Sequence, residues 1–255
     1  MKKILTAITA VALPYSMLFA QKLPTVQKAS VFAPADVKID GKINEWNNGF
    51  QAYNNATDVY YTLANDNENL YLVLRCKYHD VIEKIIRGGF TIRINHSTDK
   101  KDPAAVSFTY PVLRDADMSV VSNMLARKSY PKANGDTSTT IDVDDLNQLI
   151  AGKSKQINTT GIKSFEDNTI SVYNNEGLKV AELFNTTLAY TCELAIPLKF
   201  LNLTSNQAFS YQIKVNEPAE SKPHTMAPGE RFPPPTPIAV NGTTDFWGEY
   251  TLAKK

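Results

Sequence analysis

Apolar and polar residues alternate through most of the chain, with a period of two. Successive side chains of a β-strand point to opposite faces, so each alternating segment predicts a strand with one buried face. The apolar members of the five clearest segments are Val59, Tyr61 and Leu63; Phe90, Ile92 and Ile94; Val106, Phe108 and Tyr110; Tyr190, Cys192, Leu194 and Ile196; and Phe209, Tyr211, Ile213 and Val215. Turns rich in Asn, Asp or Gly at 65–69 and 174–177 predict hairpins between neighbouring strands.

Helical spacing is confined to two short segments. Residues 81–87 repeat apolar side chains at helical spacing before two glycines, and residues 144–151 run from an acidic start to Gly152. Each predicts one or two turns of helix. Without a β-α-β rhythm, the sequence predicts an all-β fold, an antiparallel jelly-roll-like or immunoglobulin-like β-sandwich with one or two short helices.

Two segments lack the alternation. Residues 114–168 are polar and weakly periodic, which predicts a loop-rich insertion. Residues 217–244 hold seven of the 14 prolines and predict a proline-stiffened excursion before a last strand at 246–252. We see no internal repeat or linker, so residues 21–255 are expected to form a single domain.

The first twenty residues have the pattern of a secretory signal peptide. Lys2 and Lys3 precede an apolar run, and Ala20 is a small residue at the expected cleavage site. A membrane anchor is the alternative, but Pro14 interrupts the run, which is shorter than the roughly 20 residues of a spanning helix. No later segment has the length and apolarity of a transmembrane segment. We therefore expect an exported protein, periplasmic or extracellular after cleavage.

Composition narrows the function classes. With 27 basic and 26 acidic side chains the net charge is +1, so the basic surface of a nucleic-acid binder is not expected. The 43% apolar content argues against disorder, and two cysteines argue against a disulfide-rich small protein. Cys76 and Cys192 fall on inward strand positions. A disulfide between them and two buried free thiols both fit that pattern.

Three further segments carry specific motifs. Residues 39–46 read I-D-G-K-I-N-E-W, residues 61–72 join two strands through an acidic, amide-rich turn before Asn-Leu-Tyr, and residues 190–198 end a strand in Ile-Pro. In order and spacing they resemble family 9 carbohydrate-binding modules and their DOMON-like relatives. The whole is also similar to exported proteins of Bacteroidetes-type bacteria. The resemblance implies a jelly-roll-like sandwich, glycan binding and, in some members, structural calcium.

Sugar recognition needs aromatic faces for the C–H groups and planar polar side chains for the hydroxyls. Sugar-binding members of the family that the chain resembles use a clamp of aromatic rings, usually tryptophans, and this chain has only Trp46 and Trp247. Trp46 lies in the opening motif, where we expect a core residue, so no clamp is carried over. The ligand-binding candidates are aromatic and polar residues on the outward sides of strands or turns: Trp247, Tyr60, Tyr71, Tyr173, Arg75 and Glu249. The competing interpretation is that loops cover each of these rings.

Other chemistry has weaker signals. Asp66, Glu68 and Asp80 are candidate calcium ligands, although acidic turns can be simply solvated. There is no ligand-spaced histidine pair, nucleophile elbow or phosphate-binding loop, and the sequence assigns no catalytic residue. A glycosidase remains open because it needs only two suitably spaced carboxylates. The resemblance to DOMON-like proteins implies a further alternative, axial haem ligands, with His79, His96, Met118, Met124 and Met226 as candidates.

We therefore expect non-catalytic recognition of a glycan or a cell-envelope polysaccharide. An envelope scaffold that binds a protein partner and no small ligand is the second hypothesis. The proline-rich segment, with Pro233, Pro234 and Pro235 in a row, is its candidate contact region.

Overall fold

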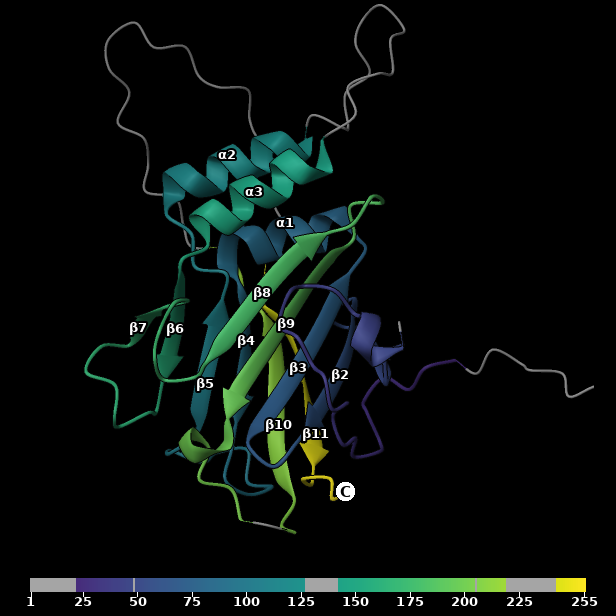
Figure 1. The fold of residues 1–255 in the computed structure, drawn as a ribbon, viewed down its shortest axis with the longest axis vertical. Coiled ribbons are helices and arrows are strands. Elements are labelled where there is room, and N and C mark those ends of the chain that lie inside the picture. The colour runs from purple at the N-terminus through teal and green to yellow at the C-terminus, as the bar shows by residue number, and fades with distance from the viewer. Residues whose placement is uncertain (1–21, 48, 127–141, 205, 219–241) are drawn as a thin grey trace, which may run out of the picture.

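The computed structural model describes residues 22–47, 49–126, 142–204, 206–218 and 242–255. In this part of the chain two antiparallel sheets pack as a sandwich, and three helices lie together over one end of it (Figure 1). The mainly β sandwich predicted from the alternation is confirmed. The predicted signal peptide at 1–20 and most of the predicted proline-rich excursion lie outside the described residues. No helix in the described ranges is both long and apolar enough to cross a membrane.

The first sheet has five described strands in the order β1-β2-β3-β9-β8. Their bounds are β1 Ala52–Asn54, β2 Val59–Asn65, β3 Asn69–Cys76, β8 Lys179–Phe184 and β9 Tyr190–Pro197. The predicted hairpin at 65–69 is confirmed, since β2 pairs with β3 and Asp66 Oδ1 accepts hydrogen bonds from the backbone N–H groups of Glu68 and Asn69 at 2.7 and 2.6 Å.

The second sheet has six described strands in the order β11-β10-β4-β5-β6-β7. Their bounds are β4 Phe90–Ile94, β5 Val106–Tyr110, β6 Gln156–Thr160, β7 Thr169–Ser171, β10 Phe209–Val215 and β11 Thr244–Tyr250. The hairpin predicted at 174–177 is wrong. This turn leads from β7 of the second sheet to β8 of the first, so the strands on either side of it do not pair.

The helices are α1 His79–Gly88, α2 Asp115–Ala126 and α3 Val143–Lys153. Both predicted helices exist and are longer than expected. The predicted number, one or two short helices, is wrong because α2 was not predicted. The segment 114–168 is therefore not only loops, since it contains α2, α3 and β6. The helical periodicity of α2 is weak in the sequence because this helix buries few apolar side chains, chiefly Val121 and Leu125. Asp117 joins α2 to α3 through an ion pair with Lys153 at 3.0 Å.

Two layers of apolar packing hold the sandwich. The main core lies between the sheets, where the buried hydroxyls of Tyr61 and Tyr211 share a hydrogen bond of 2.9 Å. A smaller core lies on the outer face of the first sheet, where Ile43 and Trp46 pack against Tyr71. Figure 1 shows the N-terminal segment crossing the front of this sheet. Part of the outer face of the first sheet is thus covered by chain that belongs to neither sheet.

The two cysteines are buried free thiols in this structure. Cys76 lies opposite Tyr190, and Cys192 lies opposite Leu74, so the two positions are offset by two residues along the paired strands β3 and β9. Burial raises the pKa of the Cys76 thiol to about 12, and it also raises that of Cys192. Of the two alternatives left open by the sequence, the structure contains the free thiols.

Replacing Gly248 with alanine should destabilise the second sheet by about 1 to 3 kcal/mol. A Cβ atom at this position of β11 would overlap the ring of Tyr211, which is fully buried and held by Tyr61. The matched control is Gly152→Ala in α3, where an added Cβ meets no atom within 4 Å and no loss of stability is expected. Urea unfolding of both variants measures the difference, and equal midpoints would contradict the packing argument.

Candidate functional site

The N-terminal segment is fastened to the first sheet by Glu193 of β9. Its Oε2 accepts hydrogen bonds from the backbone N–H groups of Asp40 and Gly41 at 3.0 and 2.8 Å, and its Oε1 accepts one from Trp46 Nε1 at 2.9 Å. Glu193 is fully buried, and Trp46 is only 7% exposed. The expectation that Trp46 belongs to the core is confirmed. We refer to Glu193 and these three donors as the Glu193 lock.

Burial dominates the electrostatics of the Glu193 lock. Loss of solvent raises the pKa of the Glu193 carboxyl to about 7, although its three N–H donors favour the ionised form. Gly41 has a φ of +81°, and a Cβ atom there would lie 2.7 Å from Leu183 Cβ. The glycine of the 39–46 motif is therefore required both by its backbone conformation and by its close approach to β8.

Beyond the lock, the chain places three half-buried aromatic rings together, which we term the aromatic platform: Phe50, Tyr53 and Tyr60. Tyr53 of β1 lies directly opposite Tyr60 of β2, and their ring centroids are 4.5 Å apart. The Phe50 ring, which precedes β1, is 5.8 Å from that of Tyr60. The platform thus forms where β1 and β2 meet the end of the N-terminal segment.

Two cations border the aromatic platform. Arg75 lies opposite Tyr60 in the sheet, and its guanidinium carbon is 5.5 Å from the centroid of the Phe50 ring. Lys77 Nζ is 4.5 Å from the centroid of Tyr60. Arg75 Nε donates a hydrogen bond of 2.9 Å to Thr191 Oγ1, which fixes the guanidinium beside the rings. The group therefore combines ring faces with charged hydrogen-bond donors.

A hollow of ≈ 410 Å³ adjoins the platform at Phe50. Lys22, Lys28 and Gln51 contribute polar side chains to its wall. On the other side, the hydroxyl of Tyr53 donates a hydrogen bond of 2.7 Å to Asp58, which raises the pKa of Tyr53. The platform is consequently held by its own contacts and has a concave surface beside it.

Of the six predicted ligand-binding residues, the structure places two at the aromatic platform, Tyr60 and Arg75. The prediction for Tyr71 is wrong, because it is 7% exposed beneath Trp46, with the ring centroids 6.0 Å apart. Its hydroxyl donates to Asp66 Oδ2 at 2.7 Å. Tyr71 thus faces outward from β3, as its alternation suggested, but the N-terminal segment covers it.

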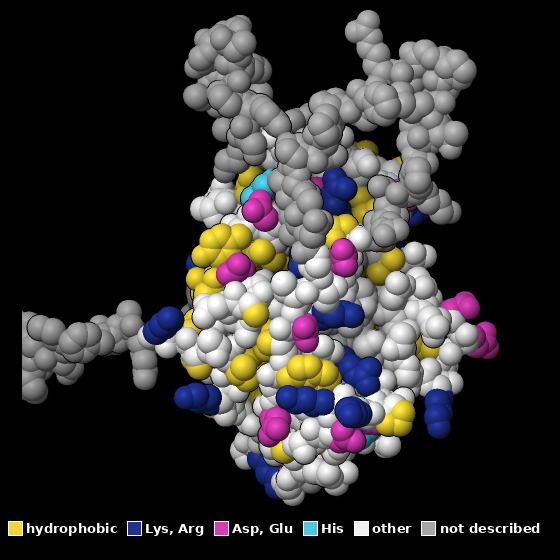
Figure 2. Space-filling model, turned by 180° about the vertical axis from the view of Figure 1, so that it is seen from behind, with side chains coloured by type: hydrophobic (Ala, Val, Ile, Leu, Met, Phe, Trp, Pro, Cys, Tyr) yellow, Lys and Arg dark blue, Asp and Glu magenta, His cyan; other side chains and the backbone are white. Residues whose placement is uncertain are grey.

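The remaining candidates lie on other surfaces. Trp247 and Glu249 are on the outer face of the second sheet, where Trp247 is opposite Gln212 and Lys100 Nζ is 5.6 Å from the centroid of its ring. Figure 2 shows the molecule from behind, with Lys and Arg side chains interspersed with acidic and hydrophobic ones. Tyr173 follows β7 and is 72% exposed, with Lys155 beside its ring. The expected aromatics therefore do not form one shared platform.

Sequence reasoning missed Phe50 and Tyr53. Tyr53 had a usable signal, because a short strand before β2 would place it beside Tyr60 once the two paired as neighbours. Phe50 is outside any strand and had no periodic signal. Its position depends on the path of the whole N-terminal segment.

The three predicted calcium ligands do not come together. Asp66 and Glu68 precede β3, whereas Asp80 follows it in α1. The eight residues of β3 separate them by roughly 25 Å. The described residues contain no group of three or more His, Cys, Asp or Glu side chains placed to hold a metal ion. The prediction that these three carboxylates share a calcium site is therefore wrong.

The haem candidates are also dispersed. His79 begins α1 and Met118 and Met124 lie in α2, at the helical end of the sandwich. His96 follows β4 at the opposite end (Figure 1). Met226 lies outside the described residues.

Comparison with known proteins assigns the chain to no family. No protein-family model matches the chain, and no curated protein matches it.

Proposed function

We propose that this protein is a non-catalytic glycan-binding protein and that it holds its ligand on the aromatic platform. The observation that carries the proposal is the group of three half-buried rings, Phe50, Tyr53 and Tyr60, bordered by Arg75 and Lys77 beside a hollow. Such a group supplies both kinds of contact that a sugar needs.

The chemistry of the platform suits a sugar unit. The axial C–H groups of a sugar pack on ring faces, and its hydroxyl oxygens accept hydrogen bonds from guanidinium and ammonium groups. Arg75 and Lys77 can donate to such oxygens, and the hydroxyl of Tyr53 is already fixed by Asp58. The near-neutral net charge of the chain also fits an uncharged ligand better than a nucleic acid.

Two finer assignments belong to the same proposal. A jelly-roll-like topology is supported by neighbouring strands that are distant in sequence, β3 beside β9 and β4 beside β10. Export to the periplasm or beyond is supported by the signal-peptide pattern of residues 1–20. Either location would bring the platform into contact with glycans or envelope polysaccharides.

A glycan array, followed by calorimetry on each hit with and without calcium, tests the proposal. Tyr60→Ala should weaken binding at least about tenfold, because it removes the central ring of the platform. Tyr173→Ala is the matched control, since it deletes an exposed tyrosine elsewhere and should leave affinity unchanged. An array without hits, or equal affinities in the two variants, would overturn the assignment.

A further inference from the structure

The lining residues of a second concave surface lie in strand connections. These connections are at the end of the sandwich opposite the three described helices (Figure 1). It is a cleft of ≈ 820 Å³ formed by three connections between strands. One connection follows β4 and carries His96, one follows β6 and carries Ile162 and Lys163, and one follows β9 and carries Lys199 and Phe200. Residues far apart in the sequence thus form one wall around a shared space.

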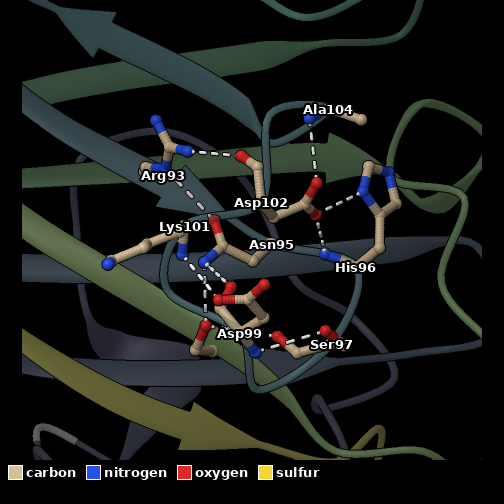
Figure 3. Close-up of polar contacts among 9 residues, drawn as sticks. Arg93, Asn95, His96, Ser97, Asp99, Lys101, Asp102 and Ala104 are labelled. Carbon is tan, nitrogen blue, oxygen red and sulfur yellow. Dashed lines mark hydrogen bonds and ion pairs between the residues drawn. The ribbon is translucent and has the colours of Figure 1, made fainter.

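The connection after β4 is fixed by the buried side chain of Asn95. Its amide nitrogen donates hydrogen bonds to the carbonyl of Asp99 at 2.6 Å and to Ser210 Oγ at 2.9 Å, and its oxygen accepts one from Arg93 Nε at 3.1 Å. Figure 3 shows Asn95 at the centre of the loop, with these contacts around it. The loop therefore has its shape before any ligand arrives.

Asp102 fixes the wall residue His96. Its Oδ2 accepts hydrogen bonds from the backbone N–H of His96 at 2.8 Å and from Nδ1 of the same residue at 2.7 Å, while Oδ1 accepts one from Ala104 at 2.8 Å (Figure 3). The backbone hydrogen bond from His96 is the main reason that the pKa of Asp102 is lowered. The negative charge of Asp102 is thus engaged within its own loop.

The cleft combines positive charge with apolar surface. Lys163 and Lys199 line it, no carboxylate is among its described lining residues, and neither lysine forms an ion pair within the described ranges. Ile162 and Phe200 supply apolar surface. The Phe200 ring is held by Phe165, with the centroids 5.1 Å apart.

We propose that this cleft binds a small organic anion, a carboxylate carried on an apolar or aromatic body. The ammonium groups of Lys163 and Lys199 would receive the carboxylate, and the body would pack against Phe200 and Ile162. A preformed wall lowers the entropy cost of binding. The cleft is separate from the aromatic platform, which adjoins the end of β3 nearest α1. The proposal for the cleft therefore does not depend on whether the platform binds a glycan.

Three probes separate charge from apolar contact in amide NMR titrations of the full chain. Benzoate has both features, inorganic phosphate has only the charge, and benzyl alcohol has only the ring. Benzoate should give saturable shifts at residues 161–164 and 199–202, and the other two should bind at least about tenfold more weakly. The absence of saturable shifts with benzoate, or phosphate binding equal to that of benzoate, would overturn the proposal.

The double variant Lys163→Ala with Lys199→Ala should weaken benzoate binding about tenfold. Both lysines are exposed, so an unchanged amide spectrum elsewhere is expected and confirms folding. The control is Lys38→Ala with Lys214→Ala, which removes equal charge from residues that line neither the cleft nor the aromatic platform. Equal loss of affinity in the two double variants would show a general charge effect and contradict a specific site.

Discussion

Between pH 5 and pH 8 the wild-type protein should lose up to about 3 kcal/mol of stability through Glu193 alone. The folded-state pKa of this carboxyl is about 7, against a usual value of 4.5. A group whose pKa is raised by folding contributes stability that is fully present below its unfolded pKa. That contribution is lost as the pH rises through the folded pKa, so the window lies between about pH 4.5 and pH 8.

Glu193→Gln isolates this effect, because the amide does not titrate. At pH 5 the variant should be less stable than wild type by about 1 to 3 kcal/mol, since its NH₂ group replaces an oxygen that accepts N–H donors. Toward pH 8 the gap should narrow as the wild-type carboxyl ionises. Urea unfolding of both proteins across this range measures the gap. A gap that stays constant with pH would show that the Glu193 lock does not bind a proton on folding.

Glu182→Ala should cost about 2 to 5 kcal/mol, because it removes the acceptor of the buried Tyr190 hydroxyl and leaves the Tyr110 hydroxyl only a long hydrogen bond of 3.4 Å to the carbonyl of Ser154. Tyr110 of β5 donates to Glu182 Oε1 at 2.9 Å, and Tyr190 of β9 donates to Oε2 at 2.7 Å. The carboxyl of β8 therefore connects both sheets through the core. Burial raises its pKa.

The matched variant at this position is Glu182→Gln, which should cost less than about 1 kcal/mol. Tyrosine hydroxyls can accept as well as donate, so either can turn to receive the amide hydrogens. The N–H donors of the Glu193 lock lack this ability, which is why glutamine should be tolerated at 182 and costly at 193 in acid solution. Unfolding midpoints of the two glutamine variants at pH 5 measure the contrast, and the reverse order would contradict these hydrogen-bond assignments.

The strands could be predicted from the sequence because burial on one face leaves a period of two along each of them. The same rule placed Tyr60 and Arg75 outward, and their direct pairing then brought them together. The rule failed for Tyr71, because it gives the direction of a side chain and not what covers it. The covering segment, with Ile43 and Trp46, has no sheet periodicity.

The parts of the sites that depend on non-local connections could not be predicted. The position of Phe50 depends on two contacts with distant strands: the Glu193 lock fastens the preceding segment to β9, and the backbone N–H of Gln51 donates to the carbonyl of Tyr61 in β2. Lys163 and Lys199 share a cleft because three connections end at the same edge of the sandwich. The spacing of residues along the chain does not predict contacts between distant segments. The hairpin at 65–69 is local, and it was predicted correctly.

The most direct test of the proposed function is a calorimetric comparison of Tyr60→Ala with Trp247→Ala, using the strongest ligand from the glycan array. The two variants remove aromatic rings from outer faces of opposite sheets. Binding on the aromatic platform predicts that Tyr60→Ala loses at least about tenfold in affinity while Trp247→Ala binds like wild type. Loss of affinity in Trp247→Ala, with Tyr60→Ala unchanged, would place the ligand on the second sheet and contradict the account.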